Sequence, residues 1–266
     1  MSGKDFQDYI VVVTGGSSGL GQAIAVDVAR RGAKAVIINY ASSRDAAEET
    51  AGMIRSQGAE AITVQGDVAD DAACKRIAEA ARPYGRIDAL FNNAGTTKFA
   101  GHADLDAVSA DDFLRLYAVN VVGAFQMLRA ARDLLEAAPQ PGAVVNTASI
   151  AGVTGIGSSV PYAASKGALN TMTLSLARAL APKIRVNAIC PGFIDTPWFG
   201  KGMPEERVQR MRENVAGSTP LKVASNAEDI AGAAVFLASP ASRHITGETL
   251  LVDAGTHLGM ASLSMR

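Results

Sequence analysis

The sequence predicts an α/β fold in which helices cover both faces of one parallel sheet. Short apolar runs alternate with longer amphipathic stretches along the 266 residues, and runs such as IVVV and AVII are almost continuously apolar. Strands covered by helices on both faces have this composition, whereas strands with one wet face alternate apolar and polar residues. Repeated strand–helix–strand units imply right-handed crossovers and therefore a doubly wound, Rossmann-type parallel sheet.

Seven apolar runs are the predicted strands, at 9–13, 35–39, 61–65, 89–92, 143–147, 185–189 and 249–252. Helical patterns lie between them, near 19–31, 44–57, 70–81, 109–137, 160–181 and 226–238. Arg31-Gly32 and Gln57-Gly58 are good helix stops, because glycine favours the position just after a helix.

The chain predicts a single domain over residues 1–266. No Pro- or Ser-rich linker, low-complexity tract or repeat of a solenoid period interrupts it. The stretch 191–219 interrupts the alternation of strands and helices. It contains Trp198 and the charged segment PEERVQRMREN. Long insertions in compact domains often close over a site, so we expect a substrate lid around 193–217. An ordinary surface helix is the alternative.

Composition excludes several classes of function. The net charge of -1 gives no attraction to nucleic acid or to an anionic membrane. No apolar run approaches the ~20 residues that span a bilayer, and the beginning does not resemble a signal peptide. The two cysteines and three histidines are scattered, so we expect reduced thiols and no metal site. We therefore expect a cytoplasmic protein that binds neither nucleic acid nor membrane.

The most informative side chains are Tyr162 and Lys166, with Ser149 thirteen residues before the tyrosine. Tyr162 and Lys166 are four residues apart in a predicted helix, so they share one face. A phenol ionises near pH ~10, and a neighbouring ammonium is expected to lower its pKa. A serine hydroxyl can hold a carbonyl or alcohol oxygen beside the phenol. The set indicates alcohol–ketone chemistry, the alternatives being a surface Tyr–Lys pair and a serine that only forms a strand-end turn.

A glycine-rich turn, TGGSSGLG, occupies residues 14–21 between the first predicted strand and helix. Gly15, Gly19 and Gly21 permit a tight turn and a close backbone approach, and free N–H groups at the helix start can bind a pyrophosphate. A plain strand-to-helix turn is the alternative, but the position after an apolar strand favours a dinucleotide site.

This turn and five further segments resemble the classical short-chain dehydrogenases/reductases. The further segments are NNAG at 92–95, Asn120, Ser149, YAASK at 162–166 and PGFIDT at 191–196. The resemblance extends over 8–255 and is strongest to 3-oxoacyl-carrier-protein reductases, many of which carry a segment like NYASSRDAAEE. It implies an NAD(P)-dependent oxidoreductase that transfers hydride between nicotinamide and a carbonyl or secondary alcohol.

By this resemblance, Asn120, Ser149, Tyr162 and Lys166 are the catalytic residues. Tyr162 is the general acid in reduction and the base in oxidation, and Ser149 donates a hydrogen bond to the substrate oxygen. Lys166 lowers the pKa of Tyr162 and binds the nicotinamide ribose. Asn120 holds a water that links Lys166 to solvent, although alone it reads as a helix-packing or kink residue. Ala148 replaces a second serine that many relatives carry.

The resemblance also implies cofactor contacts along the carboxyl edge of the sheet. They are Thr14, Gly15, Ser17, Ser18, Gly19, Leu20, Asn39, Tyr40, Ser42, Arg44, Asp67, Val68, Asn93, Ala94, Gly95, Tyr162, Lys166, Pro191, Gly192, Ile194 and Thr196.

The end of the second strand favours NADP over NAD. An acid at this place binds the adenosine ribose and selects NAD. Asn39 and Tyr40 stand there instead, followed by Ser42 and Arg44. Arg44 is otherwise a solvent-facing residue of the next helix. Asp67 is expected at the adenine, with a helix N-cap as its alternative.

The sequence leaves the small-molecule substrate open, because specificity depends on 96–103, 153–160 and 193–217. A 3-oxoacyl thioester on a carrier protein is one candidate, with Lys98, Lys201 and Arg207 as possible contacts. A sugar or other polyol dehydrogenase is another. A non-catalytic NAD(P)-sensing protein is the alternative of a different class. The resemblance also implies a homotetramer that packs through the two long helices and the last strand.

Overall fold

The computed structural model of the protein describes residues 4–200 and 204–259. Seven parallel strands form one sheet in the order β3-β2-β1-β4-β5-β6-β9. They are β1 (Ile10–Val13), β2 (Ala35–Tyr40), β3 (Glu60–Gln65), β4 (Ala89–Asn92), β5 (Gly142–Thr147), β6 (Ile184–Pro191) and β9 (Thr249–Val252). Every predicted strand is present, and the predicted fold class is confirmed.

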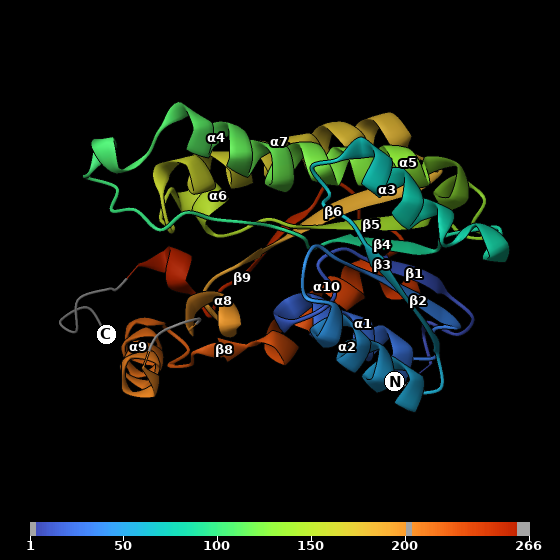
Figure 1. Ribbon diagram of the computed structural model, residues 1–266, viewed down its shortest axis with the longest axis horizontal. Coiled ribbons are helices and arrows are strands. Elements are labelled where there is room, and N and C mark those ends of the chain that lie inside the picture. Colours follow the sequence, from blue (N-terminus) through green and yellow to red (C-terminus); the bar gives the residue numbers. More distant parts are fainter. Residues whose placement is uncertain (1–3, 201–203, 260–266) are drawn as a thin grey trace.

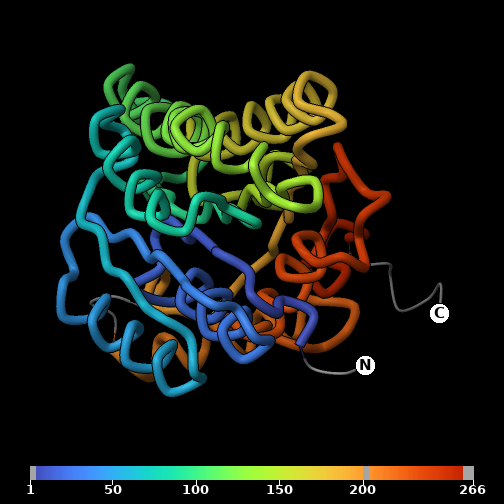
Figure 2. The backbone as a smooth tube through the Cα atoms, turned by 90° about the vertical axis from the view of Figure 1, so that its right-hand side faces the viewer, coloured from blue at the N-terminus to red at the C-terminus, as the bar shows by residue number. Residues whose placement is uncertain are grey.

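Helices cover both faces of this sheet (Figure 1). One face carries α3 (Asp71–Glu79), α4 (Ala110–Tyr117), α5 (Ala124–Glu136) and α7 (Val160–Leu180), and the other carries α1 (Gly19–Arg30), α2 (Arg44–Ser56) and α10 (Ala227–Ala238). Figure 2 shows the same layers turned by 90°, with the green and yellow helices above and the blue and orange ones below. No described helix is long and apolar enough to cross a membrane.

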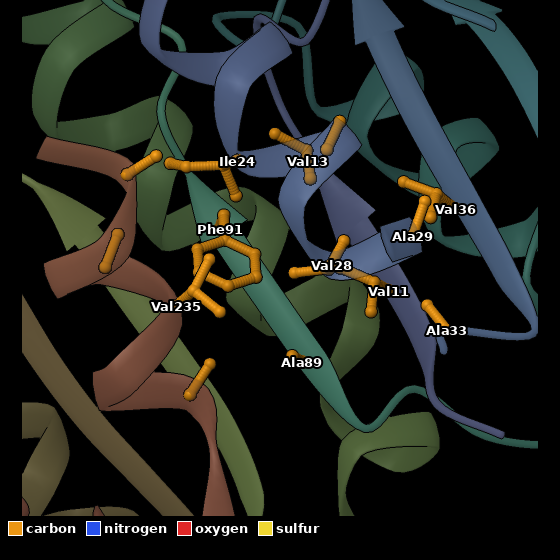
Figure 3. Packing of buried hydrophobic residues seen from close by; sticks show 14 of the residues in the cluster. Val11, Val13, Ile24, Val28, Ala29, Ala33, Val36, Ala89, Phe91 and Val235 are labelled. Atoms are coloured by element: carbon orange, nitrogen blue, oxygen red, sulfur yellow. The ribbon is translucent and has the colours of Figure 1, made fainter. Parts of the chain in front are cut away.

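Apolar side chains from both the sheet and the helices fill the space between the layers. All four residues of β1 are buried, and Figure 3 shows Ile24 and Val28 of α1 beside Phe91 of β4 and Val235 of α10. Each fully buried side chain of this size contributes about 1.5–3 kcal/mol relative to an exposed one. The continuous apolar runs of the sequence are thus explained by burial on both faces.

The helical pattern predicted near 109–137 is present as continuous helix over 110–136, but it is not α-helical throughout. A π-helical segment, Ala118–Gly123, separates α4 from α5. A Cβ on Gly123 would lie only 2.7 Å from the side chain of Val68, so the small residue lets this segment approach the loop after β3. The wider turn also brings Asn120 inward, and such segments occur frequently at functional sites.

The stretch predicted as a lid contains elements that the sequence did not reveal. β7 (Ile194–Asp195) pairs in parallel with β8 (Ser225–Asn226), and α8 (Pro197–Gly200) and α9 (Glu205–Ser218) follow β7. Residues 201–203 lie outside the described residues. Figure 1 shows α8 and α9 at the same end of the molecule as α6 (Ala151–Thr154), which follows β5.

The chain order along the sheet reverses beside β1, which has β2 on one side and β4 on the other. In doubly wound sheets a ligand binds outside the carboxyl ends of the strands at such a reversal. The predicted site residues follow the ends of β1 to β6, so the topology gathers them at this edge.

Candidate active site

The glycine-rich turn between β1 and α1 approaches its neighbours so closely that side chains are excluded. Gly15 and Gly19 have φ angles of 62° and 54°, in the left-handed region that favours glycine. A Cβ on Gly21 would lie 2.2 Å from the carbonyl oxygen of Gly15. Ser18 stands at the N-cap of α1 without capping it through its side chain, so the first N–H groups of the helix are not capped in this way. This is the arrangement that binds a phosphate group.

Side chains at the ends of β1 and β4 hold this turn to the sheet. Thr14 Oγ1 accepts hydrogen bonds from the N–H groups of Asn93 and Ala94, both at 3.0 Å. Asn93 Nδ2 donates to the carbonyl oxygens of Thr14 and Gly15, both at 3.2 Å. Leu20 is buried in the core on the other side of the turn, and Ser17 is half-buried within it. The structure thus brings the predicted contacts of β1 and β4 together.

The end of β2 differs from the expectation, because the side chains of Asn39 and Tyr40 are buried. Asn39 Nδ2 donates to the carbonyl oxygens of Val64 (3.2 Å) and Gly66 (2.9 Å), and its Oδ1 accepts from the N–H of Gly15 at 3.4 Å. Tyr40 belongs to the apolar core. Neither side chain is free to bind a ribose. The hydrogen bonds of Asn39 instead join the glycine turn to the end of β3.

The residues that follow β2 are exposed to solvent and available to a ligand. Ser42 and Arg44 are exposed at the start of α2, and Ser43 stands at its N-cap without a side-chain capping bond. Arg44 forms no salt bridge with any residue of the described ranges 4–200 and 204–259. A guanidinium and two hydroxyls therefore stand together beside a helix N-terminus, which suits a phosphate group.

The two predicted adenine contacts lie after β3. Asp67 Oδ1 accepts from the N–H of Ala69 at 2.9 Å, whereas the N-cap of α3 is Asp70, which accepts from Ala72 at 3.0 Å. The alternative of Asp67 as a helix N-cap is therefore wrong. Asp67 is exposed at the edge of the site, and Val68 is buried.

The proposed proton-transfer groups meet where β5 ends. Lys166 Nζ donates to the carbonyl oxygen of Thr147 at 2.7 Å and lies 5.7 Å from the centroid of the Tyr162 ring. The side chain of Ser149 interacts with the phenol of Tyr162 and also accepts from the N–H of Ala151 at 3.1 Å. Ser149 thus forms the strand-end turn and contacts the phenol as well, so its two predicted roles coexist.

Burial determines the charge states of both groups. It raises the pKa of Tyr162 above 10.0, while the hydrogen bond with Ser149 acts in the opposite direction. It also lowers the pKa of Lys166 from 10.5 to about 8. The expectation that Lys166 lowers the pKa of Tyr162 is therefore wrong for this arrangement, because desolvation dominates and the ammonium is directed at Thr147. At neutral pH the phenol is held as a proton donor.

Asn120 is buried and bonded on both sides of its amide. Its Oδ1 accepts from the N–H of Thr96 at 2.8 Å, and its Nδ2 donates to the carbonyl oxygen of Thr96 and to Ser165 Oγ, both at 3.0 Å. A Cβ on Gly95 would lie 3.4 Å from Asn120 Oδ1 and 3.6 Å from Lys166 Nζ. The two side chains are therefore neighbours across Gly95. A water relay between them stays a prediction.

The segment after β6 connects Ser149 with the glycine turn. The carbonyl oxygen of Pro191 accepts from the N–H of Ile150 at 2.9 Å, next to Ser149. A Cβ on Gly192 would lie 2.9 Å from the Cβ of Asp253, so the backbone passes close to the end of β9. Ile194 lies in β7, and the methyl group of Thr196 lies 3.4 Å from the position of a Cβ on Gly19.

Sequence reasoning missed an ion pair within the predicted lid that joins α9 to β7. Arg212 Nε in α9 donates to Asp195 Oδ2 at 2.6 Å, and Arg212 Nη1 donates to Glu205 Oε1 at 2.9 Å. The charged composition of α9 was visible in the sequence, but no spacing rule connects Arg212 to a residue 17 positions earlier.

These residues fit a dinucleotide, because the glycine turn has the cradle that a Cβ would fill and α1 lacks a side-chain cap. Beside it stand a phenol, a hydroxyl and an ammonium. Fold and site together define a nicotinamide-dependent oxidoreductase.

Comparisons with known proteins agree with this class. The family model described as Enoyl-(Acyl carrier protein) reductase matches residues 15–257. Ketoacyl reductase 2 of the granaticin polyketide synthase from Streptomyces violaceoruber is 39% identical over 250 residues, which cover 94% of this chain and 96% of the relative. L-rhamnose 1-dehydrogenase (NAD(P)(+)) from Sphingomonas sp. is 36% identical, covering 97% and 99% of the two chains.

The structural comparison gives the same result. The crystal structure of a short-chain dehydrogenase/reductase from Burkholderia xenovorans has a TM-score of 0.86 and 40% identity, covering 94% of this chain and 98% of the other. The chain belongs to the classical short-chain dehydrogenase/reductase family, near its 3-oxoacyl reductase type, and is an NAD(P)-dependent oxidoreductase acting on carbonyl or alcohol groups.

Proposed function

We propose that this enzyme reduces a carbonyl group to a secondary alcohol, with Asn120, Ser149, Tyr162 and Lys166 as its catalytic residues. The observation that carries the proposal is the half-buried Tyr162, whose phenol interacts with Ser149 and whose ring centroid lies 5.7 Å from Lys166 Nζ. A reduced nicotinamide, when bound, supplies hydride to the carbonyl carbon. Ser149 holds the substrate oxygen, and Tyr162 donates a proton to it as negative charge develops. The raised pKa of Tyr162 keeps the phenol protonated at neutral pH, which is the state that reduction requires of a proton donor.

Lys166 and Asn120 support this proton donor. Lys166 is oriented by its bond to Thr147 and has two further N–H groups, which we assign to the ribose hydroxyls of the cofactor. Asn120 holds Thr96 and Ser165 and lies across Gly95 from the ammonium. We assign it to the position of a relay water through which the proton of Tyr162 is replaced.

The test is the oxidation of NADPH and NADH, followed by nicotinamide absorbance, with acetoacetyl thioester, diketone, sugar and steroid ketone panels. Loss of a general acid costs about 10²–10⁴-fold, so Tyr162→Phe should lower kcat/KM by that factor. Tyr84→Phe is the matched control, because its hydroxyl bonds Glu60 far from the site. Tight cofactor binding without turnover on every panel would contradict the proposal and favour the NAD(P)-sensing alternative.

Substrate candidates follow from the relatives. A ketoacyl reductase and a sugar dehydrogenase are both similar to this chain over nearly its whole length. A 3-oxoacyl thioester and a sugar are therefore the two most informative substrates to test. Turnover of only one of them assigns the class.

We propose NADP as the preferred cofactor, with NAD as the alternative. Ser42, Ser43 and Arg44 are available to a 2′-phosphate, and no acid occupies the end of β2. A charge-assisted bond of about 1.4 kcal/mol corresponds to a tenfold change. Arg44→Ala should therefore raise the KM for NADPH about tenfold and leave that for NADH unchanged. An equal change for both cofactors would contradict this assignment.

We propose that residues 1–266 form one domain whose lid, around 193–217, closes over the substrate. The Arg212–Asp195 ion pair supports this proposal, because it fastens α9 to the strand that follows the Pro191–Gly192 backbone. Both cysteines are free and buried, which suits the reducing cytoplasm.

We propose a homotetramer, because two separate apolar surfaces are exposed. A hollow of about 560 Å³ beside α4 and α7 is lined by Leu105, Leu114 and Val160, with Leu105 and Leu114 exposed by 72% and 69%. Leu221, whose N–H bonds Ala254 just after the edge strand β9, is also exposed, as is Phe236 of α10. Two different self-complementary contacts generate a tetramer. Light scattering should show tetramers, and Leu114→Glu should give dimers.

A further inference from the structure

Three phenylalanines from two distant segments form an aromatic cluster at the candidate active site. The ring centroids of Phe193 and Phe199 are 4.9 Å apart, and those of Phe99 and Phe199 are 6.1 Å apart, both pairs with tilted planes. Phe99 is exposed by 58%, and the other two are half-buried. Phe99 therefore presents most of its ring to solvent while one side of it packs against Phe199.

The Phe99 side of the cluster is fixed to the catalytic tyrosine. The N–H of Ala100 donates to the carbonyl oxygen of Ser158 at 2.9 Å, and a ring nitrogen of His102 lies 3.0 Å from the carbonyl oxygen of Gly157. A Cβ on Gly157 would lie 3.3 Å from Cδ1 of the Tyr162 ring. The segment that carries Phe99 thus rests on the loop that covers Tyr162.

The other side of the cluster is fixed near Ser149. Phe193 follows Pro191 and Gly192, and the carbonyl oxygen of Pro191 accepts from Ile150, the residue after Ser149. Phe199 lies in α8, where its N–H donates to the carbonyl oxygen of Thr196 at 3.2 Å. The Phe99–Phe199 contact therefore joins the loop after β4 to the start of the lid, between the two segments that hold Ser149 and Tyr162.

Two basic side chains close in sequence or structure to the cluster, Lys98 and Arg212, are paired with carboxylates. Lys98 Nζ donates to Asp112 Oδ2 at 2.6 Å, and this bond lowers the pKa of Asp112 to about 2. Arg212 is paired with Asp195. Lys98 was a candidate contact for a charged carrier protein, and its partner weakens that candidacy. Lys201 lies outside the described residues, and Arg207 is exposed on α9.

We propose that Phe99, Phe193 and Phe199 form an aromatic clamp that selects flat, apolar ring ketones as substrates. Tilted aromatic rings gain most from a further planar ring, through offset or edge-to-face contact. The three rings offer no hydrogen-bond partner to the hydroxyl groups of a sugar, so an apolar ring ketone gains more from this contact. The inference rests on the proposed carbonyl reduction and names the substrate class for that site.

The experiment compares 2-tetralone, a flat bicyclic ketone, with ethyl acetoacetate, a small linear ketone, using NADPH as reductant. Loss of one aromatic contact changes affinity about fivefold to tenfold. Phe99→Ala should raise the KM for 2-tetralone by that factor, with kcat and the KM for ethyl acetoacetate unchanged within twofold. Phe99→Leu should lie between, because it keeps apolar area without the ring. Met53→Ala, an exposed apolar truncation on α2, is the matched control and should change neither substrate.

The outcomes separate the clamp from the proposed function. Turnover of ethyl acetoacetate but not of 2-tetralone by the wild type would overturn the clamp and leave carbonyl reduction intact. An equal rise of both KM values in Phe99→Ala would also overturn it, since the residue would then only shape the entrance. Absence of turnover with either ketone and with the wider panels would contradict the proposed function itself. Thermal melts should match the wild type, because Phe99 is largely exposed.

Discussion

Lys166 is a buried cation without a carboxylate partner among the described residues, and this should make it a cost to folding. Its pKa falls from 10.5 to about 8 because of burial. A group whose folded pKa is lowered in this way binds protons more weakly when folded, so the folded state is penalised wherever the unfolded lysine is charged. The penalty is complete below pH 8 and disappears as the pH rises toward 10.5.

The size of this penalty follows from the two pKa values. The difference between 10.5 and about 8 corresponds to about 3 kcal/mol at pH 7, and about 1 kcal/mol remains at pH 10. Replacement by methionine removes the penalty, but it also leaves the carbonyl oxygen of Thr147 without its donor, which costs about 1–3 kcal/mol. The second effect does not depend on pH. The difference between the two pH values therefore isolates the charge.

The assay is urea unfolding of the wild type and Lys166→Met at pH 7 and pH 10, at one protein concentration because of the proposed oligomer. The stability of the variant relative to the wild type should be about 2 kcal/mol more favourable at pH 7 than at pH 10. Other titrating groups are common to both proteins and cancel. A relative stability that is equal at the two pH values would refute the reasoning, because it would show that the folded Lys166 ionises as in water.

Three further predictions concern side chains that join separate segments of the fold through hydrogen bonds or ion pairs. Arg185 is buried and donates to the carbonyl oxygens of Leu237, Ser242 and Ile245 at 3.0–3.1 Å, so Arg185→Met should lower the free energy of unfolding by about 3 kcal/mol in urea titrations, and an unchanged midpoint would contradict this. Asn39→Ala should raise the KM for NADPH and NADH by the same factor, because Asn39 fastens the glycine turn and does not reach a ribose; a selective effect on NADH would show the opposite. Asp195→Asn should raise the substrate KM while the melting temperature changes little, because a half-exposed ion pair contributes at most about 1 kcal/mol; a large loss of stability would contradict this view of the lid.

The central strands were predictable because they are short and buried on both faces, whereas the edge strands β3 and β9 are only partly buried. The run Ile10–Val13 is apolar throughout, and Ala35–Tyr40 is apolar except for Asn39. The glycines that mark the helix ends, Gly32 and Gly58, have the positive φ angles that the sequence suggested. The gathering of Thr14, Asn93 and Ser149 at one edge then follows from parallel topology alone.

The π-helical segment was not predictable, because AVNVVG contains nothing that distinguishes it from an ordinary helical turn. Its geometry depends on contacts with distant residues, such as the close approach of Gly123 to Val68. The same limit applies to Phe99 and Phe199, which meet although they are a hundred residues apart.

The pKa of Tyr162 shows where a local rule fails. Four-residue spacing correctly placed Lys166 on the same helix face, but the spacing says nothing about solvent or about the carbonyl oxygen of Thr147. Burial acts on both groups at once, raising the pKa of Tyr162 and lowering that of Lys166. Asn39 is a similar case, because its identity was visible in the sequence while its main-chain partners on the neighbouring strand were not.

The π-helical turn between α4 and α5 allows the chain to change length by one residue without a change of fold. A turn of this kind holds one residue more than an α-helical turn, and it behaves as an insertion that the helix has absorbed. Deletion of Val121 would let the helix close to its ordinary pitch while Leu116 and Met127, both buried, keep facing the core. Only Asn120 would lose its place. A single-residue deletion here would therefore yield a folded protein that has lost the site, so relatives of different length at this position should differ in chemistry before they differ in fold.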